Sequence, residues 1–188
     1  ADVQGYRTGD VLYQAIPLFA LQGFLPLVAS ALRAGGAIFL ADRFDAAELG
    51  RASRRFDFTY ITLWAPMLDA IMRLPDDEQP VFPALRLLTA GGAPLQPEIR
   101  ARFEELVGVP VSQGFGMTEV LGVLVADYEG DAPWGSCGRV RPLGSTDMVV
   151  LDDAGDVLPP GEVGEFAVHR SCGMVGYWQR SDLYAEQF

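Results

Sequence analysis

The chain has 188 residues, of which 49% are hydrophobic and 21% are charged, and its formal net charge is −11. This length and apolar content suffice for one domain with a buried core and exclude an intrinsically disordered chain. The negative charge argues against a protein that binds nucleic acid, because such binding depends on clustered Lys and Arg. A small nucleotide can still bind, since local amides and a metal ion outweigh the global charge at a single site.

Cysteine and histidine are rare in this sequence, where Cys137, Cys172 and His169 are the only ones. The two cysteines form no CxxC pair and a single histidine completes no zinc set, so no zinc site is expected. We interpret His169 as structural rather than as a general base, because no partner residue is apparent. Two cysteines in a chain of this size are typical of a reducing compartment, which favours a cytoplasmic protein.

Residues 16–32 are apolar enough to be compared with a membrane-spanning helix. Two prolines, Gln22 and Gly23 interrupt this run, and Arg33 ends it. The length and the interruptions favour a buried segment of a globular domain and no transmembrane segment. The sequence does not open on a basic region followed by an apolar stretch, so no signal peptide is predicted.

Predicted helices and strands alternate along the first two thirds of the chain. Helices are expected to begin where Pro26, Asp45, Pro66 and Pro97 precede an apolar pattern. Asp45 and Glu48 have the spacing of a capping box. The expected helices are residues 26–34, a helix from 45 that carries Arg51, Arg54 and Arg55, residues 66–73, and a helix from 97 with Ile99, Phe103, Leu106 and Val107 on one face.

β-branched and aromatic runs between those helices predict the strands. They are residues 37–41, expected to be buried, and residues 58–62, 85–89 and 109–113. Residues 74–83, which hold three prolines and three acidic residues, are predicted as a surface loop. This alternation predicts an α/β fold with a mostly parallel sheet and flanking helices.

The last third of the chain changes to short β-rich runs separated by turn residues. We expect strands at residues 120–126, 146–151 and 163–169, forming a sheet extension or a small β-rich subdomain. The domain interpretation is an α/β part over residues 1–119 followed by a β-rich part of the same domain over residues 120–188. Tyr177, Trp178 and Tyr184 are expected to pack against the fold.

Two segments rich in glycine each follow a predicted strand. Gly91 and Gly92 come after the strand at 85–89 and can present bare backbone amides and carbonyls to the edge of a base. Ligands of open α/β sheets bind at the carboxyl ends of the strands. Two such segments on adjacent strand ends favour one shared crevice, although this first segment taken alone is about equally typical of a plain turn.

The second segment, at residues 114–119, contains more functional groups than the first. Gly114 and Gly116 allow close backbone approach, and Phe115 between them can stack on a planar base. Thr118 can hydrogen-bond a phosphate, and Glu119 can bind Mg²⁺, which prefers oxygen ligands. The residues alone slightly favour the alternative of a turn with a buried Phe and a capping Thr, because lone glycine motifs are weak signals.

Five ordered segments resemble the adenylate-forming superfamily, which contains acyl-CoA synthetases, luciferases and the adenylation domains of peptide synthetases. Their joint specificity favours a nucleotide site over plain turns at both glycine segments. Residues 16–19 with Gly23 resemble the PLFH…G pattern, and residues 89–95 resemble the adenine-binding GGAPL loop. Residues 114–119 resemble the YGMTE pattern. Residues 135–139 with 158–165 resemble GSVGRP…VPPGEVGEL, and residues 176–178 with Phe188 resemble GYW…T…F.

The resemblance implies an enzyme, an acid–thiol ligase of the acyl-CoA synthetase type. Such an enzyme joins ATP and a small-molecule carboxylic acid into an acyl-adenylate and pyrophosphate, and then transfers the acyl group to CoA with release of AMP. The implied cofactors and co-substrates are ATP or AMP, Mg²⁺ and CoA, and nucleic acid is not an implied partner.

The resemblance also implies roles for single residues. Phe115 would sandwich adenine, Thr118 would touch the α-phosphate and Glu119 would hold Mg²⁺, so Thr118 and Glu119 are the candidate catalytic residues. The nucleotide is expected along Gly91, Gly92, Ala93, Pro94, Gly114, Phe115, Gly116, Met117 and Thr118, and the acid near Trp64, Gly114, Gly116 and Met117.

The sequence departs from the family pattern at several points. Acyl-CoA synthetases usually have a histidine at the position of Ala20, and amino-acid adenylation domains have an aspartate there. The missing aspartate argues against an α-amino acid as substrate. The family's phosphate loop with its lysine, its ribose-binding TGD aspartate and its C-terminal domain are not found. The Thr8-Gly-Asp10 triplet lies at the wrong end for the TGD role. We therefore expect an internal piece of a longer enzyme that is inactive by itself.

Two other functions stay open from the sequence. One is an amino- or aryl-acid adenylation domain of a peptide synthetase, which loads a carrier protein. The other is a non-catalytic binding module on a decayed fold, which Ala20 favours and the intact Thr118 and Glu119 disfavour. Among CoA ligases, residues 114–138 look closest to the carnitine- and crotonobetaine-type enzymes.

Overall fold

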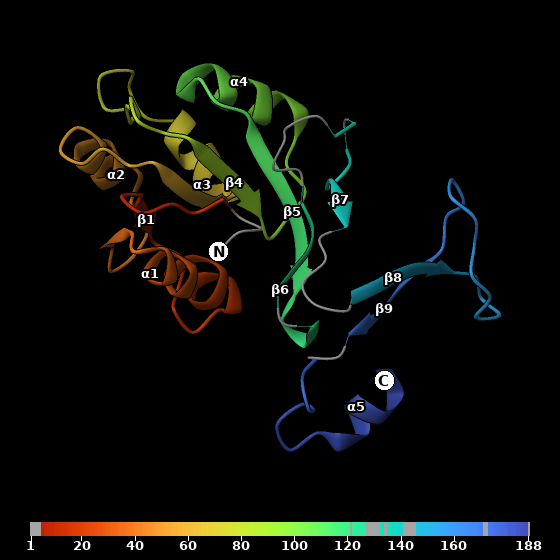
Figure 1. Ribbon diagram of the computed structural model, residues 1–188. Helices are drawn as coiled ribbons and strands as arrows, with labels where there is room; N and C mark the ends of the chain where they lie inside the picture. Colours follow the sequence, from red (N-terminus) through yellow and green to blue (C-terminus); the bar gives the residue numbers. More distant parts are fainter. Residues whose placement is uncertain are drawn as a thin grey trace.

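The computed structural model describes residues 5–120, 122–126, 132–133, 135–140, 146–170 and 173–187. Its main feature is a seven-stranded sheet with the order β2-β1-β3-β4-β5-β6-β7 (Figure 1). The first five strands in that order are parallel, which confirms the predicted α/β fold. They are β2 (Ala37–Leu40), β1 (Val11–Gln14), β3 (Tyr60–Trp64), β4 (Leu87–Gly91) and β5 (Val111–Met117).

Antiparallel strands extend this sheet and form a second one. β6 (Gly122–Ala126) pairs with β5, and β7 (Arg139–Val140) pairs with β6. β8 (Thr146–Leu151) and β9 (Glu165–Arg170) form a separate two-stranded sheet that projects beside the main one (Figure 1). The last third is therefore rich in strands, as its turn signals predict.

Helices cover both faces of the parallel strands, because alternate residues of each strand point to opposite faces. On one face, Leu12 and Tyr60 pack under η2 (Gly23–Ala29) and α1 (Ser30–Ala34). On the other face, the core residues Tyr13, Ile61 and Leu88 pack under the three helices α2 (Ala46–Ser53), α3 (Ala65–Met72) and α4 (Pro97–Val107). A further helix, α5 (Ser181–Gln187), follows the second sheet (Figure 1).

Helix ends agree with the sequence where a cap specifies them. Asp45 caps α2 by accepting a hydrogen bond from the Glu48 N–H at 2.8 Å, as the capping-box spacing predicts. Gly35 ends α1 in the left-handed region, at φ +75°. Phe103 and Val107 of α4 are buried, and Ile99 and Leu106 pack against the same core.

The helix expected to begin at Pro26 begins earlier, and that prediction is wrong. Leu21 and Gln22 are already helical, and η2 has the wider π-type turn. A proline has no N–H to donate, and such a turn accommodates that loss. The expectation that residues 16–32 are buried is also only partly right, since Phe19 is 94% and Leu32 64% exposed.

Other element boundaries differ from the predicted ones, because pairing with neighbouring strands, rather than the propensity of single residues, decides which residues belong to a strand. The strands expected at 58–62, 85–89 and 109–113 lie two residues further on or are longer. β2 is an edge strand and half exposed, where a buried strand was expected. Arg54 and Arg55 follow α2 instead of lying within it. Nothing in the sequence analysis predicted β1 or α5, which are only four and seven residues long.

Among the described residues, no helix has both the length and the apolar character needed to cross a lipid bilayer.

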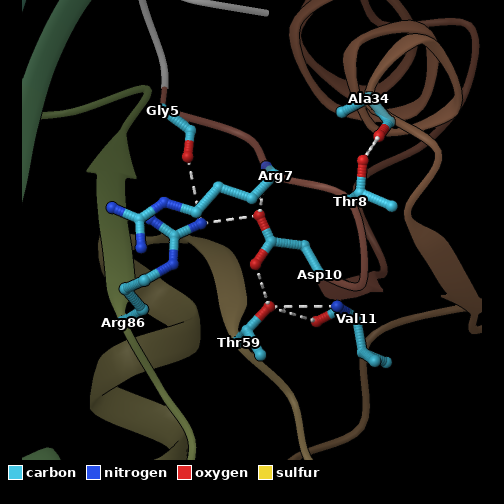
Figure 2. Close-up of polar contacts among 8 residues, drawn as sticks. All are labelled: Gly5, Arg7, Thr8, Asp10, Val11, Ala34, Thr59 and Arg86. Carbon is cyan, nitrogen blue, oxygen red and sulfur yellow. Dashed lines mark hydrogen bonds and ion pairs between the residues drawn. The ribbon is translucent and has the colours of Figure 1, made fainter.

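A hydrogen-bonded cluster ties the amino-terminal ends of β1, β3 and β4 together (Figure 2). Asp10 is 6% exposed and forms an ion pair of 2.6 Å with Arg86. The Arg7 N–H donates to the same Asp10 oxygen, Oδ2, at 2.7 Å, and the Thr59 hydroxyl donates to the other oxygen, Oδ1, at 2.9 Å. The Thr8-Gly-Asp10 triplet therefore has a structural role at this end of the sheet.

The surface loop at residues 74–83 lies against α2 so closely that it forbids a side chain at Gly50. A Cβ at this position would overlap the carbonyl oxygen of Glu78. Ser53 fixes the contact, because its hydroxyl donates to the Gly50 carbonyl and accepts from the Val81 N–H.

Gly50→Ala therefore tests tertiary contact against helix propensity. In an unhindered helix, this substitution raises the free energy of unfolding by up to about 1 kcal/mol. Here we expect a net decrease of about 1–3 kcal/mol, because the loop or the helix must move. Urea denaturation followed by circular dichroism measures the change. A more stable variant would show that the loop at residues 74–83 can move away from the new side chain without loss of stability.

Candidate functional site

A cavity of about 330 Å³ lies at the carboxyl ends of β3, β4 and β5. This is the edge of a parallel sheet where ligands bind in open α/β folds. The opposite wall comes from the segment that leads into η2, and includes Phe19, Ala20 and Gln22, with Leu27 from η2 itself. The cavity is thus enclosed by two segments that are distant in the sequence.

Most of the site residues predicted from the sequence meet at this cavity, although three do not line it. Those that line it are Trp64, Gly91, Gly92, Gly114, Phe115, Gly116, Met117 and Thr118. Ala93 and Pro94 are exposed on the turn that follows β4. Glu119 is half-buried, one residue beyond the lining.

The first glycine segment permits close packing between β4 and the opposite wall. A Cβ on Gly91 would lie 3.3 Å from the amide nitrogen of Gln22, and one on Gly92 would lie 3.2 Å from the Trp64 ring. Gly92 also has φ +79°, a region that other residues rarely adopt. The Trp64 Nε1–H donates to Gln22 Oε1 at 2.9 Å, which joins the two walls.

The second glycine segment is largely part of a strand, where the residues alone favoured a turn. β5 continues through Met117, because Gly114 to Met117 pair with the antiparallel strand β6. A register shift lies between Phe115 and Gly116, where the strand is irregular. Phe115 is 41% exposed and stacks on Phe166 of β9, with ring centroids 6.4 Å apart.

Glu119 is held in place by the segment at residues 173–177. The Tyr177 hydroxyl donates to Glu119 Oε1 at 2.9 Å, and the Met174 N–H donates to the Glu119 carbonyl at 2.8 Å. The hydrogen bond to the carboxylate raises the pKa of Tyr177 above its usual value, because it stabilises the protonated phenol. The Glu119 carboxylate therefore has a defined orientation.

The donor set around Glu119 fits Mg²⁺. Over the described part of the chain, no group of three or more His, Cys, Asp or Glu side chains forms a ready-made metal cluster. Mg²⁺ is usually bound through one or two carboxylates together with substrate phosphates and water, and it does not require such a cluster. A single, oriented carboxylate beside a candidate phosphate site meets that requirement.

The floor of the cavity carries hydroxyl groups that the sequence analysis missed. Tyr60, Thr62, Thr89 and Ser112 all line it, and Thr62 Oγ1 and Thr89 Oγ1 are 2.6 Å apart. Burial raises the pKa of Tyr60, because it disfavours the charged phenolate. Thr62 and Thr89 each lie two residues before the end of a parallel strand, a signal that could have revealed them.

Several other sequence predictions concern residues away from the cavity. Trp178 is 89% exposed, so the expectation that it packs is wrong. Cys137 is a free cysteine, whereas Cys172 and Phe188 lie outside the described residues. His169 belongs to β9, but its side chain is not among the described parts.

Comparisons with known proteins agree with the fold and the motifs. A long-chain-fatty-acid–CoA ligase of Escherichia coli O6:H1 is 29% identical over 179 residues, covering 94% of this chain and 32% of the relative. ATP-bound MatB from Rhodopseudomonas palustris has a TM-score of 0.83 at 25% identity, covering 100% of this chain and 37% of that one. O-succinylbenzoate CoA synthetase from Bacillus subtilis, solved with ATP and magnesium ion, has a TM-score of 0.79 at 26% identity, covering 98% and 38%.

The chain therefore spans about a third of the length of the proteins it matches. The family described as AMP-binding enzyme matches residues 1–178, which is nearly the whole chain. This chain belongs to the AMP-binding enzyme family, within the adenylate-forming superfamily that its five ordered segments resemble.

Proposed function

We propose that this chain is part of an ATP-dependent acid–thiol ligase that activates a small carboxylic acid and transfers it to CoA. The observation that carries the proposal is the cavity at the carboxyl ends of β3, β4 and β5. Both glycine segments of the family pattern border it, although they are about 20 residues apart in the chain.

The proposed reaction has two balanced steps. A carboxylate oxygen attacks the α-phosphorus of ATP, the bond to the β-phosphate bridging oxygen breaks, and pyrophosphate leaves. A thiolate sulfur then attacks the acyl carbon, and the bond to the AMP oxygen breaks. Bringing the two reactants together in one orientation supplies much of the rate enhancement in reactions of this kind.

The residues at the cavity have separate roles in this proposal. Phe115 and the backbone at Gly91 and Gly92 bind adenine, and the Thr118 hydroxyl donates to the α-phosphate. Glu119 holds the metal ion, with its carboxylate oriented by Tyr177. Mg²⁺ bound there supplies charge neutralisation for the phosphates. The acid lies beside Trp64, Gly114, Gly116 and Met117.

Residues 1–119 and 120–188 act, in this proposal, as two parts of one nucleotide-binding domain. The contacts that support it run between those parts. The hydrogen bond from Tyr177 reaches Glu119, and Phe166 stacks on Phe115. The β-rich part thereby sets the position of the residues that bind the nucleotide.

Carboxylate-dependent exchange of labelled pyrophosphate into ATP tests the first step. It should be measured on the complete gene product, since the relatives are about three times as long as this chain. We expect exchange that requires both a carboxylic acid and Mg²⁺, followed by formation of an acyl-CoA when CoA is added. If none of the acids in a panel of aliphatic and aromatic acids supports exchange, the proposal is contradicted.

The same assay distinguishes the two other functions. An acyl group that is transferred to the phosphopantetheine of a carrier protein, and not to CoA, would indicate an adenylation domain of a peptide synthetase. ATP binding without exchange would indicate a non-catalytic module.

A further inference from the structure

The hydroxyl groups on the cavity floor form a row across three neighbouring strands. Thr62 of β3 is in register with Thr89 of β4, and Thr89 is in register with Ser112 of β5. Residues that are in register on adjacent strands present their side chains on the same face of the sheet. Thr62 and Ser112 are 2% and 1% exposed, so the row lies at the bottom of the cavity and not at its mouth.

Ser112 is the unsatisfied end of this row. Thr62 and Thr89 hydrogen-bond each other at 2.6 Å, and both also interact with the Tyr60 phenol. No other residue in the described part of the chain gives the Ser112 hydroxyl oxygen a hydrogen-bond partner. Burial of an unpaired hydroxyl is unfavourable, so native structures seldom retain one without a reason.

Part of the remaining cavity lining is apolar or already hydrogen-bonded. Gln22 Oε1 already accepts the Trp64 Nε1–H, and the Leu27 and Ala20 side chains are apolar. A volume of about 330 Å³ is at the lower end of the range for ligand pockets, roughly 300–1,000 Å³. Part of that volume borders the two glycine segments that are proposed to bind the nucleotide. The remaining volume would not enclose a long alkyl chain.

We infer that the acid bound in this cavity is a small carboxylic acid that carries a hydroxyl group at the end distant from its carboxylate. That hydroxyl lies against Ser112 Oγ and completes the row that Thr62 and Thr89 begin. The inference rests on the proposed function and specifies its substrate class. An acid with a methyl group at the same position would leave the Ser112 hydroxyl buried and unpaired.

Matched pairs of acids that differ only by a hydroxyl or a methyl group test the inference. Suitable pairs are 4-hydroxybutyrate with pentanoate, and 3- or 4-hydroxybenzoate with the corresponding methylbenzoate. The readout is kcat/KM for each acid in ATP–pyrophosphate exchange by the complete gene product. In at least one pair we expect a preference for the hydroxyl acid of about tenfold or more, because sites that hydrogen-bond a substrate hydroxyl reject analogues without it.

Ser112→Ala should abolish that preference, lowering kcat/KM for the hydroxyl acid and leaving or raising it for the methyl acid. Ser112→Thr keeps a hydroxyl group at this position and should retain part of the preference. The matched control is Ser30→Ala, because Ser30 lies in α1 outside the cavity, with its hydroxyl 3.4 Å from the Leu25 carbonyl. It should keep the full preference.

The outcomes separate this inference from the function on which it rests. Exchange that favours the methyl acids in every pair would overturn the inference and leave the ligase function in place, and this result requires no variant to fold. A hydroxyl preference that Ser112→Ala leaves unchanged would likewise overturn the role of Ser112. Absence of exchange with every acid would overturn the proposed function, and the inference with it.

Discussion

Glu119→Gln is expected to lower carboxylate-dependent ATP–pyrophosphate exchange by about a hundredfold or more, because it removes the charge that, in the proposed function, holds the metal ion at the phosphates. The fold should survive the change. A glutamine carbonyl can still accept the hydrogen bond that Tyr177 donates to Glu119 Oε1 at 2.9 Å, and the Met174 bond to the Glu119 backbone is unaffected.

Two measurements together test the assignment of the metal to Glu119. Exchange is measured across a range of Mg²⁺ concentrations, and Mn²⁺ binding in the presence of ATP is followed by electron paramagnetic resonance. We expect Glu119→Gln to weaken both. The matched control is Glu105→Gln, because Glu105 is exposed on α4 and away from the cavity, and it should behave as the wild type. Unchanged exchange in Glu119→Gln would show that the metal is held elsewhere.

Asp10→Ala is expected to lower the free energy of unfolding by about 3 kcal/mol, because removal of one partner of a buried ion pair leaves the other charge uncompensated. Asp10 is buried, and its carboxylate contacts Arg86, the Thr59 hydroxyl and the Arg7 N–H (Figure 2). The substitution removes all of these contacts together. Urea denaturation of the chain, followed by tryptophan fluorescence, measures the loss.

A surface ion pair of similar length provides the control for this prediction. Asp69 of α3 and Arg73, which caps the end of that helix, are 2.8 Å apart, but the Arg73 and Asp69 side chains are 78% and 43% exposed. Asp69→Ala should cost less than about 1 kcal/mol, because water screens exposed pairs. If both variants lose the same free energy of unfolding, burial does not increase the contribution of the Asp10 ion pair to stability. The cavity should be unaffected in both, since Asp10 precedes β1 and lies at the amino-terminal end of the strands.

The elements that the sequence predicts well are those with a local physical cause. Asp45 predicts the start of α2 because its side chain caps that helix directly, and Pro97 predicts α4 because a proline suits a first turn. The parallel order of the sheet follows from the alternation of helices and strands. The two helix starts depend on residues within one turn of each other, and the parallel strands depend on a pattern that repeats along the chain.

Predictions fail where residues outside a segment decide its structure. Gly114 to Met117 resemble a turn because they contain two glycines, but pairing with β6 makes them a strand. Phe19 and Leu32 resemble core residues because they are apolar, yet they are exposed. Propensity describes a residue and its neighbours, whereas burial and pairing depend on what the rest of the chain places beside it.

The candidate site divides in the same way. The sequence by itself determined the family and the two glycine segments, because both are carried by consecutive residues whose chemistry suits a nucleotide. Only the tertiary structure decided that Tyr177 orients Glu119 and that Phe166 stacks on Phe115. It alone also placed Thr62, Thr89 and Ser112 in one row. Those three hydroxyls are about 50 residues apart at most and meet only because β3, β4 and β5 are neighbours in register.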